Sequence, residues 1–371
     1  MNTASLNVSS ILRLQSFDLP PKGVYASFIF ATLNYLVILF CNLSLMATII
    51  MNKSLHQPMY LLLFNLPVND LIGSSALFPQ LIKQILLDSG YIEVSNCIVQ
   101  AFFIHVYGVG SVFILVAMAY DRYMAICNPL KYSTIMTHSH IIRIIALVWL
   151  MDLLLMGVLF FLLLRLPRCR SLMSHSYCDN PSLLRLVCAD TTINNIYGLC
   201  LLASMQVFSV GMIIFTYLQI LYACFKSKRP DTKSKAVQTC ATHLTVFLLL
   251  ECLGLFTIIS YRIKHLSPHS RRMIGVSTLI FPPTLNPIIY GLKTKEIRQR
   301  ITLPFRKMVR AIQEVGQDWG SEEEKIGTGS GKEQDQAGNR TGADMNQELG
   351  KRREEAGHKH EGKEQGNLAP N

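Results

Sequence analysis

The sequence is short of charge. Charged residues make up 16% of its 371 residues, whereas a soluble domain carries roughly 25%. Hydrophobic residues make up 50%, and the mean hydropathy is +0.31. A soluble domain cannot hide this much apolar side chain from water, which argues against a soluble enzyme. The same composition argues against a disordered chain or a small disulfide scaffold, and it indicates a protein that crosses a membrane several times.

Motifs that carry common enzyme chemistry are also missing. The chain has no His-Glu-x-x-His, no Gly-x-Ser-x-Gly and no phosphate-binding Gly-x-x-x-x-Gly-Lys segment. It shows no internal repeat, which a transporter built from duplicated halves would have. We therefore expect neither an enzyme nor a transporter, and no required cofactor or nucleic-acid partner.

What the sequence does have is long apolar stretches. A helix needs about 20 residues to cross ~30 Å of hydrocarbon, and seven stretches are long enough. None alternates with a period of two, so they predict helices and not a barrel. Glu251, Pro282 and Pro283 interrupt the last two stretches. The seven lie near 24–50, 58–86, 98–126, 140–164, 195–224, 238–261 and 273–292.

Basic residues and cysteines indicate which end faces out. With the N-terminus outside, the inner segments hold 16 Lys and Arg against 11 in the outer segments, as the positive-inside rule favours. We expect residues 1–23 to be extracellular, with Asn7 in an Asn-Val-Ser glycosylation sequon. Four cysteines then fall outside, where disulfides persist and three pairings are possible. These are Cys97, Cys169, Cys178 and Cys188.

The composition changes after the seventh stretch. Residues 294–312 mix basic and apolar side chains, which suits an amphipathic helix on membrane lipid. Residues 313–371 hold almost no aromatic or branched apolar side chain and have 13 acidic against 8 basic residues. Such a segment cannot offset its ordering entropy, so we expect a disordered cytoplasmic tail. The membrane-spanning core is thus 24–293.

Ionisable residues inside a membrane are costly and mark function. Asp121-Arg122-Tyr123 ends the third stretch, where an acid and a guanidinium can pair in one conformation and separate in another. A plain interfacial ion pair is the alternative. In the seventh stretch, Asn286-Pro287 predicts a kink with a freed carbonyl group. The other ionisable residues inside the predicted spans are Asp70, Asp152, His243 and Glu251.

Several segments together resemble one family. Met118–Leu130 contains Met-Ala-Tyr-Asp-Arg-Tyr-Met-Ala-Ile-Cys-Asn-Pro-Leu, and Lys235–Leu244 reads Lys-Ala-Val-Gln-Thr-Cys-Ala-Thr-His-Leu. Leu55–Tyr60, Pro283–Tyr290 and a long outer loop with three cysteines fit the same pattern. Over residues 20–300 the chain resembles a rhodopsin-like G-protein-coupled receptor of the olfactory family, of the fish type. The resemblance implies an all-α seven-helix membrane bundle with a short eighth helix.

The same resemblance implies a function. The receptor would bind a small odorant between its helices and activate a stimulatory, olfactory-type G protein, raising cyclic AMP from the plasma membrane of olfactory neurons. Its disulfides would be Cys97–Cys178 and Cys169–Cys188. The residues implied in coupling and switching are Asp121, Arg122, Tyr123, Tyr217, His243, Asn286, Pro287 and Tyr290. A receptor of the same fold for another small molecule or a peptide is the closest rival.

The resemblance also implies a ligand pocket and an ion site. Asp70, Ser111 and Asn286 match positions that hold an allosteric sodium ion in many such receptors. Glu251 departs from the family, which has an aromatic residue there; it is either a hydrogen-bonded structural acid or a ligand anchor or proton sensor. Basic outer loops would attract anions or simply be solvated. The pocket positions are His105, Gly108, Val109, Met205, Gln206, Glu251, Gly254, Ile258 and Leu279.

Overall fold

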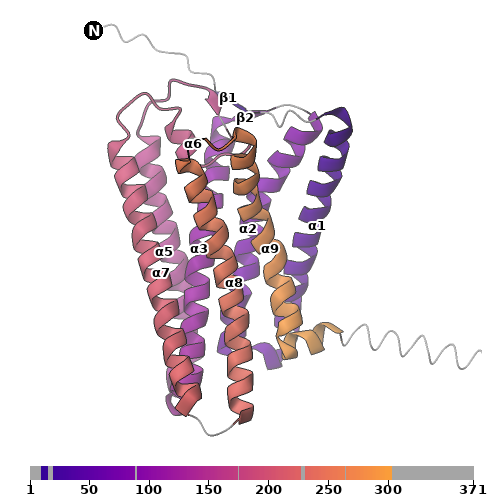
Figure 1. The fold of residues 1–371 in the computed structure, drawn as a ribbon, viewed down its shortest axis with the longest axis vertical. Helices are drawn as coiled ribbons and strands as arrows, with labels where there is room; N and C mark the ends of the chain where they lie inside the picture. The colour runs from indigo at the N-terminus through magenta and orange to yellow at the C-terminus, as the bar shows by residue number, and fades with distance from the viewer. Residues whose placement is uncertain are drawn as a thin grey trace, which may run out of the picture. The chain divides into compact units, whose positions relative to one another are not determined.

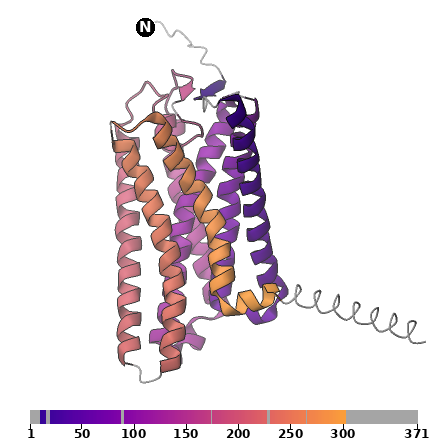
Figure 2. The ribbon, with the colours of Figure 1, turned by 45° about the vertical axis from the view of Figure 1, so that its right-hand side comes forward.

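The computed structural model describes residues 10–15, 20–87, 90–173, 175–226, 230–263 and 265–302. Seven of the helices in these ranges are long and apolar enough to cross a membrane, as the sequence predicts (Figure 1). They run side by side as one bundle (Figure 2). The seven are α1 (Pro21–Met51), α2 (Pro58–Leu87), α3 (Val94–Cys127), α5 (His138–Leu164), α7 (Thr192–Lys226), α8 (Pro230–Arg262) and α9 (Pro268–Lys293).

The remaining elements are short. They are η1 (Lys53–Leu55), α4 (Pro129–Ile135) and α6 (Asn180–Leu184), with strands β1 (Ile11–Leu14), β2 (Tyr91–Glu93) and β3 (Leu172–Met173). Residues 295–302 are also helical, at the start of the predicted eighth helix. The rest of that helix, the tail 313–371 and Asn7 lie outside the described residues.

The sheet was not predicted from the sequence. β1 is its central strand, antiparallel to β2 and parallel to β3. Its four residues alternate, with Leu12 and Leu14 buried and their neighbours exposed, but so short a run gives too weak a signal to detect. Three segments far apart in the sequence therefore meet at one end of the bundle (Figure 1).

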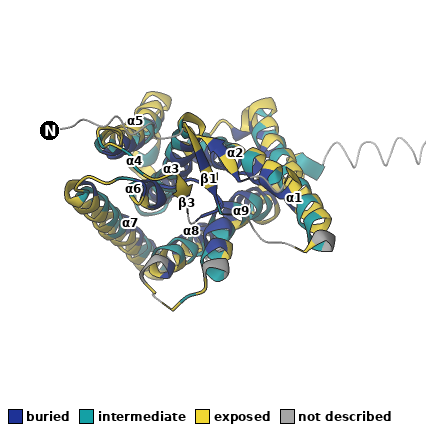
Figure 3. Cartoon of the chain, turned by 90° about the horizontal axis from the view of Figure 1, so that it is seen from above, coloured by how far each residue is buried: buried dark blue, intermediate teal, exposed yellow. Residues whose placement is uncertain are grey.

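Helix α3 lies inside the bundle. In its most apolar window 61% of residues are buried, compared with 11% in α7. Seen from above, exposed residues cover the outer faces of α1, α5 and α7, while buried residues line the interior (Figure 3). α3 packs against α2, α5, α7 and α8. Because the outer faces are apolar, lipid is the solvent that suits them.

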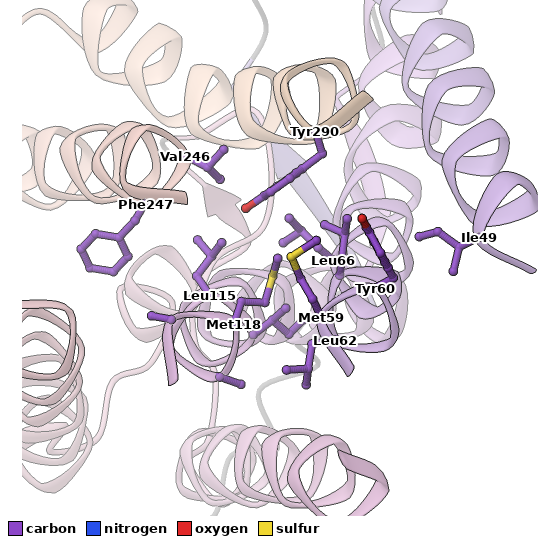
Figure 4. Packing of buried hydrophobic residues seen from close by; sticks show 14 of the residues in the cluster. Ile49, Met59, Tyr60, Leu62, Leu66, Leu115, Met118, Val246, Phe247 and Tyr290 are labelled. Atoms are coloured by element: carbon purple, nitrogen blue, oxygen red, sulfur yellow. The ribbon is translucent and has the colours of Figure 1, made fainter. Parts of the chain in front are cut away.

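Apolar packing is dense toward the end of the bundle opposite the sheet. Ile49 of α1, Met59 of α2, Met118 of α3, Val246 of α8 and Tyr290 of α9 belong to one buried cluster (Figure 4). The cluster also contains Ile141 of α5 and Ile213 of α7, so it brings all seven long helices together around the C-terminal half of α3. Dispersion contacts in it are individually small and collectively large.

Helix α9 contains three prolines, and at the last of them another helix supplies a donor to the freed carbonyl group. Pro287 has no N–H, so the Pro283 carbonyl one turn earlier loses its partner. The Nδ2 of Asn42, on α1, donates to that carbonyl over 2.9 Å. It also donates to Ile38 of its own helix. The carbonyl group that the sequence predicts to be freed is thus hydrogen-bonded by a side chain of α1.

This bond can be tested by substitution. Asn42→Leu leaves the buried Pro283 carbonyl unpaired, so we expect the free energy of unfolding to fall by about 1–3 kcal/mol. Thermal unfolding of the purified receptor measures the loss. Asn34→Leu is the matched control, because the Asn34 side chain bonds only within α1, to the Phe30 carbonyl. Equal losses in the two variants would contradict the interhelical role.

Candidate functional site

The C-terminal end of α3, opposite the sheet, carries an ion pair with a third partner. The Arg122 guanidinium donates to Asp121 Oδ2, with Nε at 2.9 Å, and Asp121 is fully buried. Tyr132, on α4, donates its hydroxyl to Asp121 Oδ1 over 2.8 Å. Burial and the Asp121 charge raise the pKa of Tyr132, so its hydroxyl remains a donor. Asp121 thus accepts from a guanidinium and a phenol at once.

Tyr132 was missed by the sequence reasoning. It follows the Asn128-Pro129 dipeptide, whose proline starts α4 at its first turn. The turn places Tyr132 against Asp121, although the two lie 11 residues apart. The signal available was the position of a tyrosine one turn after a helix-starting proline.

Two further tyrosines contact α8 near this end. Tyr217, on α7, donates its hydroxyl to the Cys240 carbonyl over 3.0 Å. The hydroxyl of Tyr290, on α9, lies 3.1 Å from Nδ1 of buried His243. The predicted switch residues Tyr217, His243 and Tyr290 therefore all make contacts in the N-terminal half of α8. Tyr123 instead packs its ring 5.7 Å from that of Phe215.

A buried polar pair lies between α2 and α9. Asn286 Nδ2 donates to both oxygens of Asp70, at 3.2 and 3.0 Å, and Asp70 is fully buried. The Oδ1 atom of Asn286 has no partner in the described part of the chain. Ser111, expected beside them, bonds elsewhere: its hydroxyl donates to the Tyr107 carbonyl and accepts from Asn69 Nδ2. Of the three residues predicted for the ion site, Asp70 and Asn286 are thus in contact, whereas Ser111 is bonded to Asn69 of α2.

At the expected pocket, Glu251 is buried and bound to α7. Gln206 Nε2 donates to its Oε2 over 2.7 Å, and the Ser209 hydroxyl donates to its Oε1 over 3.3 Å. One turn along α8, a methyl group added at Gly254 would meet no atom within 4 Å. The same holds for Gly108 on α3. Open space therefore adjoins two of the predicted pocket positions.

The other pocket positions are partly buried. His105 places Nδ1 2.8 Å from the Ala101 carbonyl, and its ring meets Phe160 edge to face. Leu279 is buried against α1 and α2 side chains. Intermediate exposure is shared by Val109, Met205 and Ile258.

A separate cleft of about 630 Å³ lies between α2 and α3, away from Glu251. It is lined by side chains of these two helices and of β2, among them Lys83, Gln100 and Phe103. Gln100 also holds the outer loop, because its Oε1 accepts from the Cys178 N–H over 2.9 Å. This cleft and the family-implied pocket are therefore different places, and the polar groups that converge on Glu251 favour the latter.

Disulfides join Cys97 to Cys178 and Cys169 to Cys188, the pairs that the resemblance implies. The first ties α3 to the loop between α5 and α7, and the second closes that loop on itself. Two basic residues at the rim of this end donate to backbone carbonyls. Arg271 donates to the Ser260 and Ile263 carbonyls, and Arg165 donates to Leu162.

One histidine lies among these rim charges. Burial lowers the pKa of His175, and the nearby charges of Arg185, Arg271 and Arg272 lower it further against the opposing effect of Asp179. The imidazole is therefore neutral at physiological pH.

Asp152, whose direction the sequence left open, points into the bundle. It is fully buried on α5, and neither of its carboxyl oxygens has a partner among the described residues. A methyl group at Gly110 would lie 3.0 Å from Asp152 Oδ2 and 2.7 Å from Asn69 Oδ1, which also has no partner. Two buried acceptors thus face the same glycine.

The comparisons with known proteins agree on one family. The family model described as Olfactory receptor matches residues 31–308. Human olfactory receptor 52D1 is 39% identical over 272 residues, which is 72% of this chain and 85% of that protein. Human olfactory receptor 52R1 is 35% identical over 306 residues, which is 81% of this chain and 95% of that protein. The chain belongs to the olfactory receptor family.

The fold agrees with this assignment. The crystal structure of squid rhodopsin superimposes with a TM-score of 0.60 at 18% identity, covering 78% of this chain and 87% of that one. The chain is therefore an odorant receptor of the G-protein-coupled class and a multi-pass plasma-membrane protein. The fish-type expectation stays a prediction, because these similar receptors are human.

Substitution of Asp152 tests the two buried acceptors, Asp152 and Asn69, that face Gly110. Asp152→Asn keeps the shape, removes a group whose charge is costly in this interior, and supplies an N–H toward Asn69 Oδ1. We expect thermal stability equal to or above wild type. Asp152→Ala instead leaves Asn69 Oδ1 without a partner, as in the wild type, and adds a cavity, so it should cost about 2 kcal/mol. A loss in the Asn variant as large as in the Ala variant would contradict this account.

Proposed function

We propose that this odorant receptor binds a small extracellular molecule between α3, α7, α8 and α9 and activates a stimulatory heterotrimeric G protein. Cyclic AMP would be the messenger, in olfactory neurons, and the chain would act as a receptor without enzymatic activity. The observation that carries the proposal is the Asp121–Arg122–Tyr132 arrangement at one end of α3, in a chain of this family. An ion pair that can open at that end suits a two-state receptor.

The orientation follows from the two ends of the bundle. Both disulfides and the three-stranded sheet lie at one end, and disulfides persist in oxidising compartments. We assign that end and the N-terminus to the extracellular side. The Arg122 end and the C-terminus would then be cytoplasmic. Basic residues of 294–312 would contact lipid there.

A ligand would act by preferring one of two conformations. The Tyr217 and Tyr290 contacts hold the inner ends of α7 and α9 to α8, and the Asp121–Arg122 pair keeps the guanidinium against α3. In the coupled state Arg122 would leave Asp121 and face the G protein, with the two tyrosines supporting the displaced α8. A ligand shifts this equilibrium only by its difference in affinity for the two states.

A sodium ion fits the Asp70–Asn286 pair. The carboxyl group of Asp70 and the unpartnered Oδ1 of Asn286 are both buried oxygens of the kind that a hard cation prefers. The Ser111 hydroxyl would need to turn from Asn69 to join them. Bound there, the ion would supply positive charge beside Asp70 and favour the resting packing of α2 against α9.

The coupling role of Arg122 predicts a selective loss. Arg122→Ala should abolish the cyclic AMP response of transfected cells to a chemically diverse odorant panel, because no guanidinium group remains to contact the G protein. Surface protein should stay near the wild-type amount. Arg143→Ala, an exposed arginine near the start of α5, is the control and should respond normally. A normal response of Arg122→Ala at equal surface expression would refute the coupling role.

The sodium proposal predicts a salt-specific stabilisation. An ion that binds only the folded state at ten times its Kd stabilises it by about 1.4 kcal/mol. Wild type should therefore unfold at a higher temperature in sodium chloride than in choline chloride of equal ionic strength. Asp70→Asn should lose this difference, whereas Asp152→Asn should keep it. Equal unfolding temperatures of wild type in both salts would overturn the ion site.

A further inference from the structure

Glu251 joins two helices that otherwise approach each other at few points. Its two carboxyl oxygens accept from two side chains of α7, Gln206 at 2.7 Å and Ser209 at 3.3 Å. These donors lie three residues apart, so they stand on one face of α7. Only 9% of the Glu251 surface is exposed, and Ser209 is fully buried. The carboxyl group is therefore a fastening between α7 and α8, inside the bundle.

The Glu251 carboxyl group has hydrogen-bond donors beside it, but no cation among the described residues pairs with it. Within the described residues, the ion pair that the structure shows joins Arg122 to Asp121, and Glu251 has no such partner. An ionised carboxyl group buried without a cation costs several kcal/mol, and two neutral donors offset only part of that. A positively charged group brought next to Glu251 would remove the deficit.

Space for such a group adjoins the carboxyl. Gly254 lies one turn along α8 from Glu251, and Leu250 and Phe247 on the same side are buried. This register points Gly254 into the bundle, where an added methyl would meet no atom within 4 Å. Gly108 of α3 is equally open. A small molecule in this space could reach Glu251 with one end.

We propose that Glu251, Gln206 and Ser209 form a latch that holds α8 to α7 in the resting receptor, and that odorants carrying a protonated amine open it. The ammonium group pairs with the Glu251 carboxylate and displaces the Gln206 and Ser209 donors. α8 is then free to move away from α7 at its inner end. The inference rests on the proposed function, because it assigns the ligand class and the trigger of that same receptor.

The ligand class is tested with two molecules of equal length. Hexylamine and hexanol are applied to cells that express wild type or Glu251→Gln, at matched surface amounts. Wild type should respond to hexylamine at concentrations about tenfold or more below those for hexanol, which corresponds to about 1.4 kcal/mol. Glu251→Gln keeps the shape and removes the charge, so this preference should disappear.

The latch itself is tested without ligand. Ser209→Ala and Gln206→Leu each remove one donor to Glu251, so basal cyclic AMP should rise several-fold above wild type at equal surface expression. The control is Ser204→Ala on the same helix, whose hydroxyl bonds only to the Leu201 carbonyl. Its basal signal should match wild type.

Each result bears on one claim. A wild-type receptor that answers other odorants but prefers hexanol, or shows equal potency for both molecules, would overturn the ligand class. Unchanged basal signalling in both donor variants would overturn the latch. A chain in which no odorant raises cyclic AMP, while a control receptor does so in the same cells, would instead refute the proposed function itself.

Discussion

The absence of water inside the bilayer governs this structure. A buried polar side chain that finds a partner within the protein avoids a large desolvation cost, and the partners within reach are on neighbouring helices. Asn42 on α1 completes the carbonyl that Pro287 frees on α9, and Asn65 on α2 accepts from Trp149 on α5 over 3.0 Å. Asn286 and Asp70 link α9 to α2. Because lipid gives apolar surfaces little reason to associate, these bonds set which helices are neighbours.

The same constraint creates places where the molecule can change state. A polar group that is fully bonded is rigid, whereas one bonded by weaker or exchangeable donors has an alternative. Asp121 accepts hydrogen bonds from both Arg122 and Tyr132, and Glu251 accepts hydrogen bonds from two neutral donors. Both lie at boundaries between helices. The sites of change are therefore the points where polar bonding between helices admits more than one arrangement.

The seven spans could be predicted because hydropathy over about 20 residues is a strong signal, and the structure places helices at all seven. The Asp121-Arg122-Tyr123 motif could also be recognised from the sequence. Tyr132, Gln100 and the partners of Glu251 were not, because each contact joins residues far apart in the sequence or on different helices. The β1 strand escaped because four residues carry too little pattern. Side-chain partners depend on helix rotation, which periodicity fixes only coarsely.

The central position of β1 has a consequence for biosynthesis. The strand precedes every described helix in the chain, yet its two neighbours, β2 and β3, are translated about eighty and one hundred and sixty residues later. With the sheet on the extracellular side, as proposed, β1 can pair with β2 once the segment before α3 has been exported, but with β3 only after the segment that follows α5. The sheet closes only after α5 has been inserted, and so does the adjoining Cys97–Cys178 bond. The outer end of the bundle is thus completed late, and its closure reports that the first four spans have been threaded in the correct direction.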